Sequence, residues 1–225
     1  MQPFTPAFHL GTPHGVVAAF HLPDSPAPVD PAVLAELAPE EAAYAATLGG
    51  YVQVSFVGGR LALRAARRMV GAPLDAVLPD PRGTPVLSRG WVGSVSHKRT
   101  LAVAMVARDV EGTLGVDLED LMPERQSVTD KVLRPEEVEA VSALPPHLVW
   151  NATVLRFSMK ESIYKALDPF VRRYVGFHEA SVRPSLEGTA EITLDLAQGE
   201  GPFAVEGRFQ WLEGRVLTSV RIRRA

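Results

Sequence analysis

Apolar residues recur at helical spacing in four stretches of the chain. In one of them, Val54, Val57 and Leu61 follow one another at intervals of three and four residues, which places them on one helix face. Helices are predicted over residues 32–48, 54–70, 124–144 and 148–167. Asp168 and Pro169 are expected to end the last helix, because proline lacks the N–H that a continuing helix needs.

Shorter apolar runs bounded by turn residues predict β-strands. They lie at residues 16–22, 91–96, 101–107 and 113–119, and further short strands are expected between residues 177 and 222. Four prolines between residues 71 and 89 exclude a regular helix there, so this segment is expected to be a loop.

Both halves of the chain therefore carry a few strands and one long helix. We expect an α+β protein with two similar lobes, each a small, mostly antiparallel sheet packed on a long helix, related by a pseudo-two-fold axis. The predicted lobes are residues 1–112 and 113–225, with the active site in the cleft between them. Two lobes in one chain make a monomer the default expectation.

Composition narrows the functional classes. The 225 residues are 46% hydrophobic and 22% charged, as in a soluble globular protein. The absence of cysteine excludes disulfides, a thiol nucleophile and cysteine-ligated metals. A net charge of −3 argues against nucleic acid as the partner. No signal peptide or long apolar segment is visible, so we expect a cytoplasmic protein that does not enter a membrane.

The first segment with chemical potential is residues 93–97, Gly-Ser-Val-Ser-His, at the end of an apolar strand. Backbone N–H groups, a hydroxyl and an imidazole at a strand end are groups that phosphate oxygens accept hydrogen bonds from. The alternative interpretation is a polar hairpin turn with a capping histidine.

The second segment is residues 115–119, Gly-Val-Asp-Leu-Glu. Side chains alternate along a strand, so Asp117 and Glu119 project from the same face. Two adjacent carboxylates repel each other unless a cation lies between them, and hard oxygen ligands suit Mg²⁺ or Mn²⁺. An edge strand with its acidic face in solvent is the alternative.

The third segment is residues 156–166, which contain Glu161 and Lys165. Residues four apart lie on one helix face, so the two side chains are neighbours. Either they form a surface ion pair, or Glu161 is a third metal-binding carboxylate and Lys165 is a cation that binds a phosphate.

In this order the three segments resemble the motifs of the 4′-phosphopantetheinyl transferases, of the two-lobed type that serves siderophore, polyketide and nonribosomal peptide synthases. The matching residues are 92–97, 115–119 and 157–166, with weaker matches at 59–62 and 82–85. The resemblance implies an enzyme that moves the phosphopantetheine arm of coenzyme A to a serine hydroxyl of an acyl or peptidyl carrier protein, releasing 3′,5′-ADP.

The resemblance also implies the roles of the acidic residues. Asp117, Glu119 and Glu161 would hold Mg²⁺, with Mn²⁺ as an alternative. Glu161, or a metal-bound water that it orients, would accept the serine proton. Lys165 would bind the phosphates and stabilise charge on the leaving side.

The remaining implied residues bind coenzyme A. His97 would contact the phosphates, and Ser96 and Lys160 would help to seat the nucleotide. Arg60 and Arg82 would meet the 3′-phosphate, because a planar guanidinium suits bidentate contact with phosphate.

One feature departs from the pattern of the family. Residues 51–56 carry no charge, whereas many relatives have a basic cluster there. Two alternative functions remain, a metal-dependent nuclease and a non-catalytic protein that binds coenzyme A or a carrier protein.

A carrier protein that presents an acidic helix needs a basic patch on the enzyme. The candidates for this patch are Arg125, Lys131, Arg134, Arg172 and Arg173.

Overall fold

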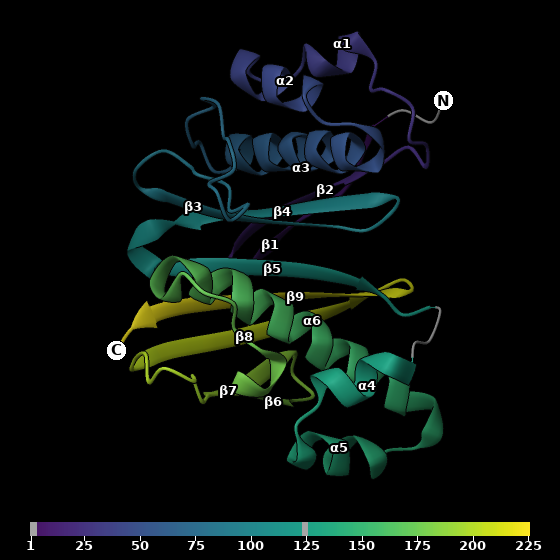
Figure 1. Cartoon of the computed structure of the whole chain (residues 1–225), viewed down its shortest axis with the longest axis vertical. Coiled ribbons are helices and arrows are strands. Elements are labelled where there is room, and N and C mark those ends of the chain that lie inside the picture. Colours follow the sequence, from purple (N-terminus) through teal and green to yellow (C-terminus); the bar gives the residue numbers. More distant parts are fainter. Residues whose placement is uncertain (1–3, 123–125) are drawn as a thin grey trace. The chain divides into compact units, whose positions relative to one another are not determined.

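The computed structural model describes residues 4–122 and 126–225, without the side chains of residues 126–128. The chain forms two compact units, Met1–Glu111 and Gly112–Ala225. Each unit contains one antiparallel sheet with a long helix packed on it (Figure 1). The predicted α+β fold with two antiparallel sheets is confirmed, and the two-fold relation between the lobes stays a prediction.

The first unit has a four-stranded sheet in the order β1-β2-β4-β3. Helix α3 lies between this sheet and the two short helices α1 and α2 (Figure 1). Val57 and Leu61 of α3 pack against Ala102 of β4, and Leu63 packs near Ala104. The elements are β1 (Thr5–Thr12), β2 (Gly15–His21), α1 (Pro31–Leu34), α2 (Pro39–Ala46), α3 (Gly50–Met69), β3 (Trp91–His97) and β4 (Leu101–Arg108).

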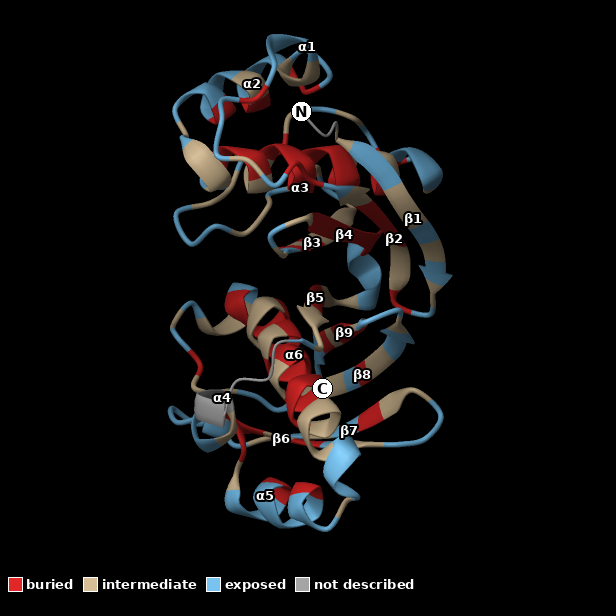
Figure 2. Ribbon diagram, turned by 90° about the vertical axis from the view of Figure 1, so that its right-hand side faces the viewer, coloured by how far each residue is buried: buried red, intermediate tan, exposed pale blue. Residues whose placement is uncertain are grey.

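The second unit has a five-stranded sheet in the order β5-β9-β8-β7-β6. Met159, Ile163 and Ala166 of the long helix α6 form the core with Val220 and Ile222 of β9. Much of α6 is accordingly buried and is coloured red in Figure 2. The elements are β5 (Thr113–Asp120), α4 (Gln126–Val132), α5 (Pro135–Ser142), α6 (Pro146–Val171), β6 (Ala180–Pro184), β7 (Thr189–Leu194), β8 (Phe203–Leu212) and β9 (Arg215–Arg224).

Prolines account for most differences from the predicted helices. The segment 32–48 forms two helices because Pro39 begins α2. The predicted helix 124–144 begins outside the described residues, and its described part, from residue 126 on, divides in the same way at Pro135. The prediction that Pro169 ends the last helix is wrong, since α6 continues to Val171. A proline this close to a helix end removes one backbone hydrogen bond, and the next residue after Val171, Arg172, ends the helix in the left-handed conformation.

Strand β1 is an element that the sequence patterns did not predict. It lies at the edge of the sheet and contains Pro6, and its residues are exposed or half-buried. An edge strand needs no apolar alternation of the kind that identifies a buried strand, and it tolerates proline. Among the described residues, no helix is long and apolar enough to cross a membrane.

A network of ion pairs around Arg173 stabilises the loop that follows α6. Its guanidinium donates to Glu179 Oε2 at 2.6 Å and to Glu200 Oε1 at 2.6 Å. Glu179 also accepts hydrogen bonds from the N–H groups of Gly176 and Ala197. The hydrogen bond from Arg173 is the main reason that the pKa of Glu179 falls from 4.5 to about 2.

We expect this carboxylate to make stability depend on pH. A depressed pKa in the folded state contributes stability that is fully present above the unfolded value near 4.5 and is lost as the pH falls toward 2. The free energy of unfolding should therefore differ between the parent and Glu179→Gln at pH 6, and the difference should shrink between pH 4.5 and pH 2. A constant difference over that range would contradict the assignment.

Candidate functional site

A pocket of about 520 Å³ in the first unit brings together two of the predicted residues, Arg60 of α3 and His97 of β3. Gly83, from the loop between α3 and β3, lies on the same pocket wall. The other walls are largely aromatic and apolar, from Tyr44, Leu48, Tyr51, Val52, Phe56, Pro79, Pro85 and Val95 with Ser55. A cation and an imidazole in an apolar pocket form an environment suited to an anion with a flat ring.

Arg60 is the dominant charge of this pocket. Its side chain lies on the ring of Phe56, with the guanidinium carbon 4.5 Å from the ring centroid, and the residue is only 5% exposed. Burial lowers the pKa of Arg60 to about 10, an effect that Glu41 and Tyr44 partly offset. Within the described residues, Arg60 Nε is buried and has no hydrogen-bond partner. A buried guanidinium with an unused donor fits a phosphate ligand.

The remaining predicted residues of the first unit do not line the pocket. Strand alternation puts Ser96 on the opposite face of β3 from Val95 and His97, and Ser96 is buried there. Arg82 is exposed, and its backbone N–H donates to Asp80 Oδ1 at 2.8 Å. The structure thus brings Arg60 and His97 together and leaves Ser96 and Arg82 outside this pocket.

Aromatic residues at this pocket were missed by the sequence analysis. The rings of Tyr44 and Phe56 have centroids 4.9 Å apart, and Arg99 stacks on Tyr51 at 3.5 Å from the ring centroid. Tyr51 and Phe56 belong to the uncharged segment that departs from the basic pattern of many relatives. The signal that could have identified the wall was the pair of aromatic residues at the ends of that segment, with Phe56 one helical turn before Arg60.

In the second unit, Gly115 brings strand β5 against the backbone of α6. A Cβ atom at residue 115 would lie 1.9 Å from the carbonyl oxygen of Ser162, a distance that no side chain can occupy. Thr113 Oγ1 donates to the carbonyl of Ala166 at 2.7 Å on the same side of the strand. This close approach explains the glycine that precedes the acidic residues, and it sets Asp117 next to the helix.

Asp117 is buried and bound by two groups of α6. Lys165 Nζ donates to Asp117 Oδ1 at 2.8 Å and to the carbonyl of Val116 at 3.0 Å. Ser158 Oγ donates to Asp117 Oδ2 at 2.9 Å. A cation therefore already lies against this carboxylate, which shows that the face of β5 toward α6 accommodates positive charge beside Asp117.

Glu119 and Glu161 lie on the elements that carry these groups. Glu119 shares the β5 face of Asp117, and Glu161 is three residues after Ser158 and four before Lys165 on α6, hence on the same helix face. Among the described residues, however, no three His, Cys, Asp or Glu side chains are gathered as metal ligands. Lys165 instead provides the positive charge at Asp117. The three-carboxylate metal site stays a prediction.

Comparison with known proteins decides the family. The model of the 4′-phosphopantetheinyl transferase N-terminal domain matches residues 40–107, and that of the 4′-phosphopantetheinyl transferase superfamily matches residues 113–218. The chain is 33% identical over 205 residues to 4′-phosphopantetheinyl transferase Svp of Streptomyces mobaraensis, covering 87% of this chain and 82% of that one. The chain belongs to the 4′-phosphopantetheinyl transferase family.

Two further relatives agree with this assignment. The transferase is 30% identical over 204 residues to 4′-phosphopantetheinyl transferase PptT of Mycobacterium tuberculosis, covering 85% of this chain and 88% of that one. It is 34% identical over 144 residues to enterobactin synthase component D of Salmonella typhimurium, covering 62% of this chain and 57% of that one. The resemblance inferred from the three sequence motifs is confirmed.

Lys160 of this transferase is engaged inside the second unit. Its Nζ donates to Glu137 Oε2 at 2.6 Å and to the carbonyl of Val132 at 2.8 Å, and the residue is 3% exposed. Burial lowers the pKa of Lys160, although Glu137 partly offsets this. The structure gives Lys160 a partner in the protein, and its predicted role in seating the nucleotide stays a prediction.

Two of the basic residues suggested for carrier docking, Arg134 and Arg173, already contact other groups of the protein. Arg134 pairs with Glu136 at 2.7 Å and donates to the carbonyl of His178. Arg173 is held by two glutamates, as described above. Arg125 lies outside the described residues. Lys131 on α4 and Arg172 directly after α6 are both exposed, so these two residues of the set lie at the surface.

Proposed function

We propose that this transferase moves the 4′-phosphopantetheine arm of coenzyme A to a serine hydroxyl of an apo acyl or peptidyl carrier protein. The serine oxygen forms a bond to the phosphorus that carries the arm, and the bond from that phosphorus to the bridging oxygen breaks. The bridging oxygen leaves with 3′,5′-ADP, and the serine proton passes to a base. Family membership supports the reaction, and the buried Arg60 with its unused Nε donor is the observation that carries the binding site.

The pocket around Arg60 supports the coenzyme A part of this proposal. Arg60 binds the 3′-phosphate, with Arg82 approaching from the neighbouring loop, and His97 donates to a phosphate oxygen. The aromatic walls at Tyr44 and Phe56 provide apolar surface for the adenine ring. Neither Ser96 nor Lys160 is among the residues that line this pocket, so their contacts with the nucleotide require them to reorient.

The carboxylates of β5 and α6 support the proposal of a divalent cation, Mg²⁺ or Mn²⁺. Their oxygens are the hard donors that these ions prefer, and Asp117 already binds one cationic group. Asp117, Glu119 and Glu161 would hold the ion, and when bound it neutralises charge on the phosphates. Lys165 then leaves Asp117 and stabilises charge on the departing 3′,5′-ADP. Glu161 accepts the serine proton.

Replacing Arg60 with alanine should mainly weaken coenzyme A binding. Hydrogen bonds to charged groups contribute about 1.5–3 kcal/mol each, so KM for coenzyme A should rise about 10- to 100-fold with little change in kcat. Arg68→Ala is the matched control, because Arg68 is exposed on the same helix. Steady-state kinetics with varied coenzyme A measure both values. An unchanged KM in Arg60→Ala would remove Arg60 from the site.

The reaction itself is tested by incubating the protein with coenzyme A, Mg²⁺ and an apo carrier protein, and weighing the carrier by mass spectrometry. We expect the carrier to gain the mass of one phosphopantetheine arm, and to gain nothing when its serine is replaced by alanine. Coenzyme A binding without any mass gain would favour the alternative of a non-catalytic binding protein. The proposed carriers are those of siderophore, polyketide and nonribosomal peptide synthases. The proposal also includes a cytoplasmic location and a monomeric enzyme.

A further inference from the structure

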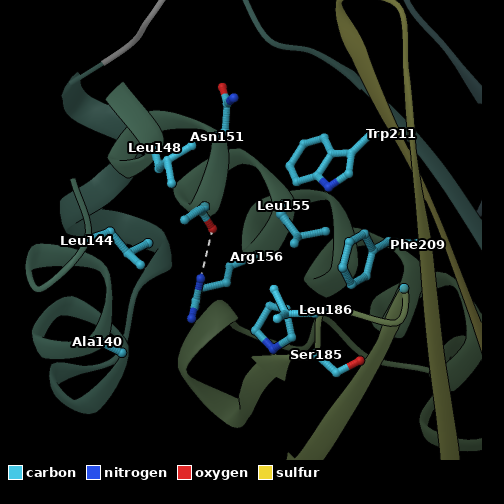
Figure 3. Close-up of a pocket in the computed structure, with 13 residues that line it drawn as sticks. Ala140, Leu144, Leu148, Asn151, Leu155, Arg156, Ser185, Leu186, Phe209 and Trp211 are labelled. Carbon is cyan, nitrogen blue, oxygen red and sulfur yellow. Dashed lines mark hydrogen bonds between the residues drawn. The ribbon is translucent and has the colours of Figure 1, made fainter. Parts of the chain in front are cut away.

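A second pocket, of about 610 Å³, lies wholly within the second unit and shares no residue with the pocket around Arg60 (Figure 3). Its walls come from α5, α6, the turn between β6 and β7, and strand β8. They are mainly apolar, with Leu144, Leu148, Leu155, Leu186, Phe209 and Trp211 among them. Asp117, Lys165 and the other proposed groups of the arm transfer do not line it.

The pocket surface is unusually apolar for an exposed feature of the unit. The side chain of Leu186 is fully exposed at the turn between β6 and β7, and Trp211 is 45% exposed. Phe209 and Trp211 meet edge to face, with ring centroids 5.9 Å apart, and both face the pocket (Figure 3). Such a concave apolar surface of this volume is the usual form of a small-molecule site.

Arg156 is the one strongly charged side chain among the described residues of this pocket. The residue is 7% exposed, and its Nη1 donates to the carbonyl of Ala152 one helical turn earlier, at 3.0 Å (Figure 3). Its Nε is buried without a hydrogen-bond partner among the described residues. Burial also lowers the pKa of Arg156. A buried guanidinium with an unused Nε donor can be satisfied by a ligand that accepts hydrogen bonds.

No acid of the protein is free to neutralise Arg156 in the described part of the chain. Glu137 is the acid that acts on it electrostatically. Both oxygens of Glu137 are already used, by Lys160 Nζ at 2.6 Å and by the backbone N–H groups of Arg134 and Val182. The charge of Arg156 is thus left for a ligand.

We propose that this pocket binds a small aromatic monocarboxylate. The ring lies against Leu155, Phe209 and Trp211, and the carboxylate accepts hydrogen bonds from the guanidinium of Arg156. A carboxylate matches the planar fork of arginine, and its single negative charge matches a single cation. A phosphate ester fits less well, because a doubly charged group would be left uncompensated among apolar walls.

The proposal is tested by calorimetric titration of the whole protein with naphthalene-2-carboxylate. We expect saturable binding to one site, at least 10-fold weaker binding of the neutral naphthalene-2-carboxamide, and loss of carboxylate binding in Arg156→Met. Arg183→Met is the matched control, because Arg183 lies on the adjacent strand β6 with its side chain 84% exposed, and it should bind like the parent. Equal binding to the parent and Arg156→Met, or no saturable binding, would overturn the proposal.

Thermal unfolding separates this role from a purely structural one. If Arg156 serves a ligand, Arg156→Met should have a Tm equal to or above that of the parent without ligand, because methionine removes a buried charge and its unused Nε donor. The carboxylate should raise the Tm of the parent and of Arg183→Met but not that of Arg156→Met. A Tm of Arg156→Met well below that of the parent would indicate that the arginine stabilises the fold instead. KM for coenzyme A should be unchanged in Arg156→Met, so failure here leaves the proposed transfer untouched.

Discussion

Asp117→Asn is expected to lower kcat for arm transfer by about 100-fold or more, while KM for coenzyme A changes little. The amide keeps the shape of the side chain and its place beside Ser158, but it removes the negative charge that Lys165 now meets and that a divalent cation would need. Titration with Mg²⁺ should show that the concentration needed for half-maximal activity rises in the variant.

Asp120→Asn is the matched control for this prediction. Asp120 is three residues further along β5, on the opposite face, where it pairs with Arg215 at 2.7 Å near the protein surface. We expect its kcat to stay within about two-fold of the parent, since this half-buried pair faces away from Asp117. Equal activity of Asp117→Asn and the parent would exclude a role for the Asp117 carboxylate in the reaction.

Lys160→Met is expected to cause the largest loss of stability, about 3–5 kcal/mol. It leaves the carboxylate of Glu137 buried without its cation, and such a loss is a large part of the total stability of a typical domain. Urea unfolding measures it. The double variant Glu137→Gln with Lys160→Met should recover part of the loss, because the remaining charge is also removed.

Glu191→Gln provides the comparison, since Glu191 and Arg183 form an exposed ion pair at 3.4 Å. Its cost should stay below about 1 kcal/mol. A similar loss in Lys160→Met and Glu191→Gln would show that the buried pair does not stabilise the second unit. At temperatures where Lys160→Met remains folded, its KM for coenzyme A reports whether Lys160 also touches the nucleotide, as the resemblance implies.

The predicted strands and long helices follow from local patterns that the sequence displays directly. Val54, Val57 and Leu61 mark α3 because helix periodicity and burial coincide there. The Gly-Val-Asp-Leu-Glu segment marks β5 because its apolar and acidic residues alternate. Strand β1 was missed because an edge strand does not need that alternation. The extent of α6 past Pro169 depends on how near the helix end the proline lies, which periodicity does not report.

Site residues were predictable as residue types but not as neighbours. Motif likeness identified Arg60 and His97 for the same ligand, and the structure places both at one pocket. Motif likeness could not indicate that Ser96 faces the other side of β3. Nor could it indicate that Lys160 forms an ion pair with Glu137, which lies far from any motif. Sequence patterns assigned no role to Arg156, next to the third motif, because its unused Nε donor is a property of tertiary packing.

A crystal structure with coenzyme A and Mg²⁺ tests the central claim most directly. We predict nucleotide density in contact with Arg60 and His97, one cation ligated by Asp117, Glu119 and Glu161, and Lys165 Nζ moved from Asp117 Oδ1 to a phosphate oxygen. A nucleotide bound away from Arg60, or an intact pair of Lys165 and Asp117 with no cation beside it, would contradict the account.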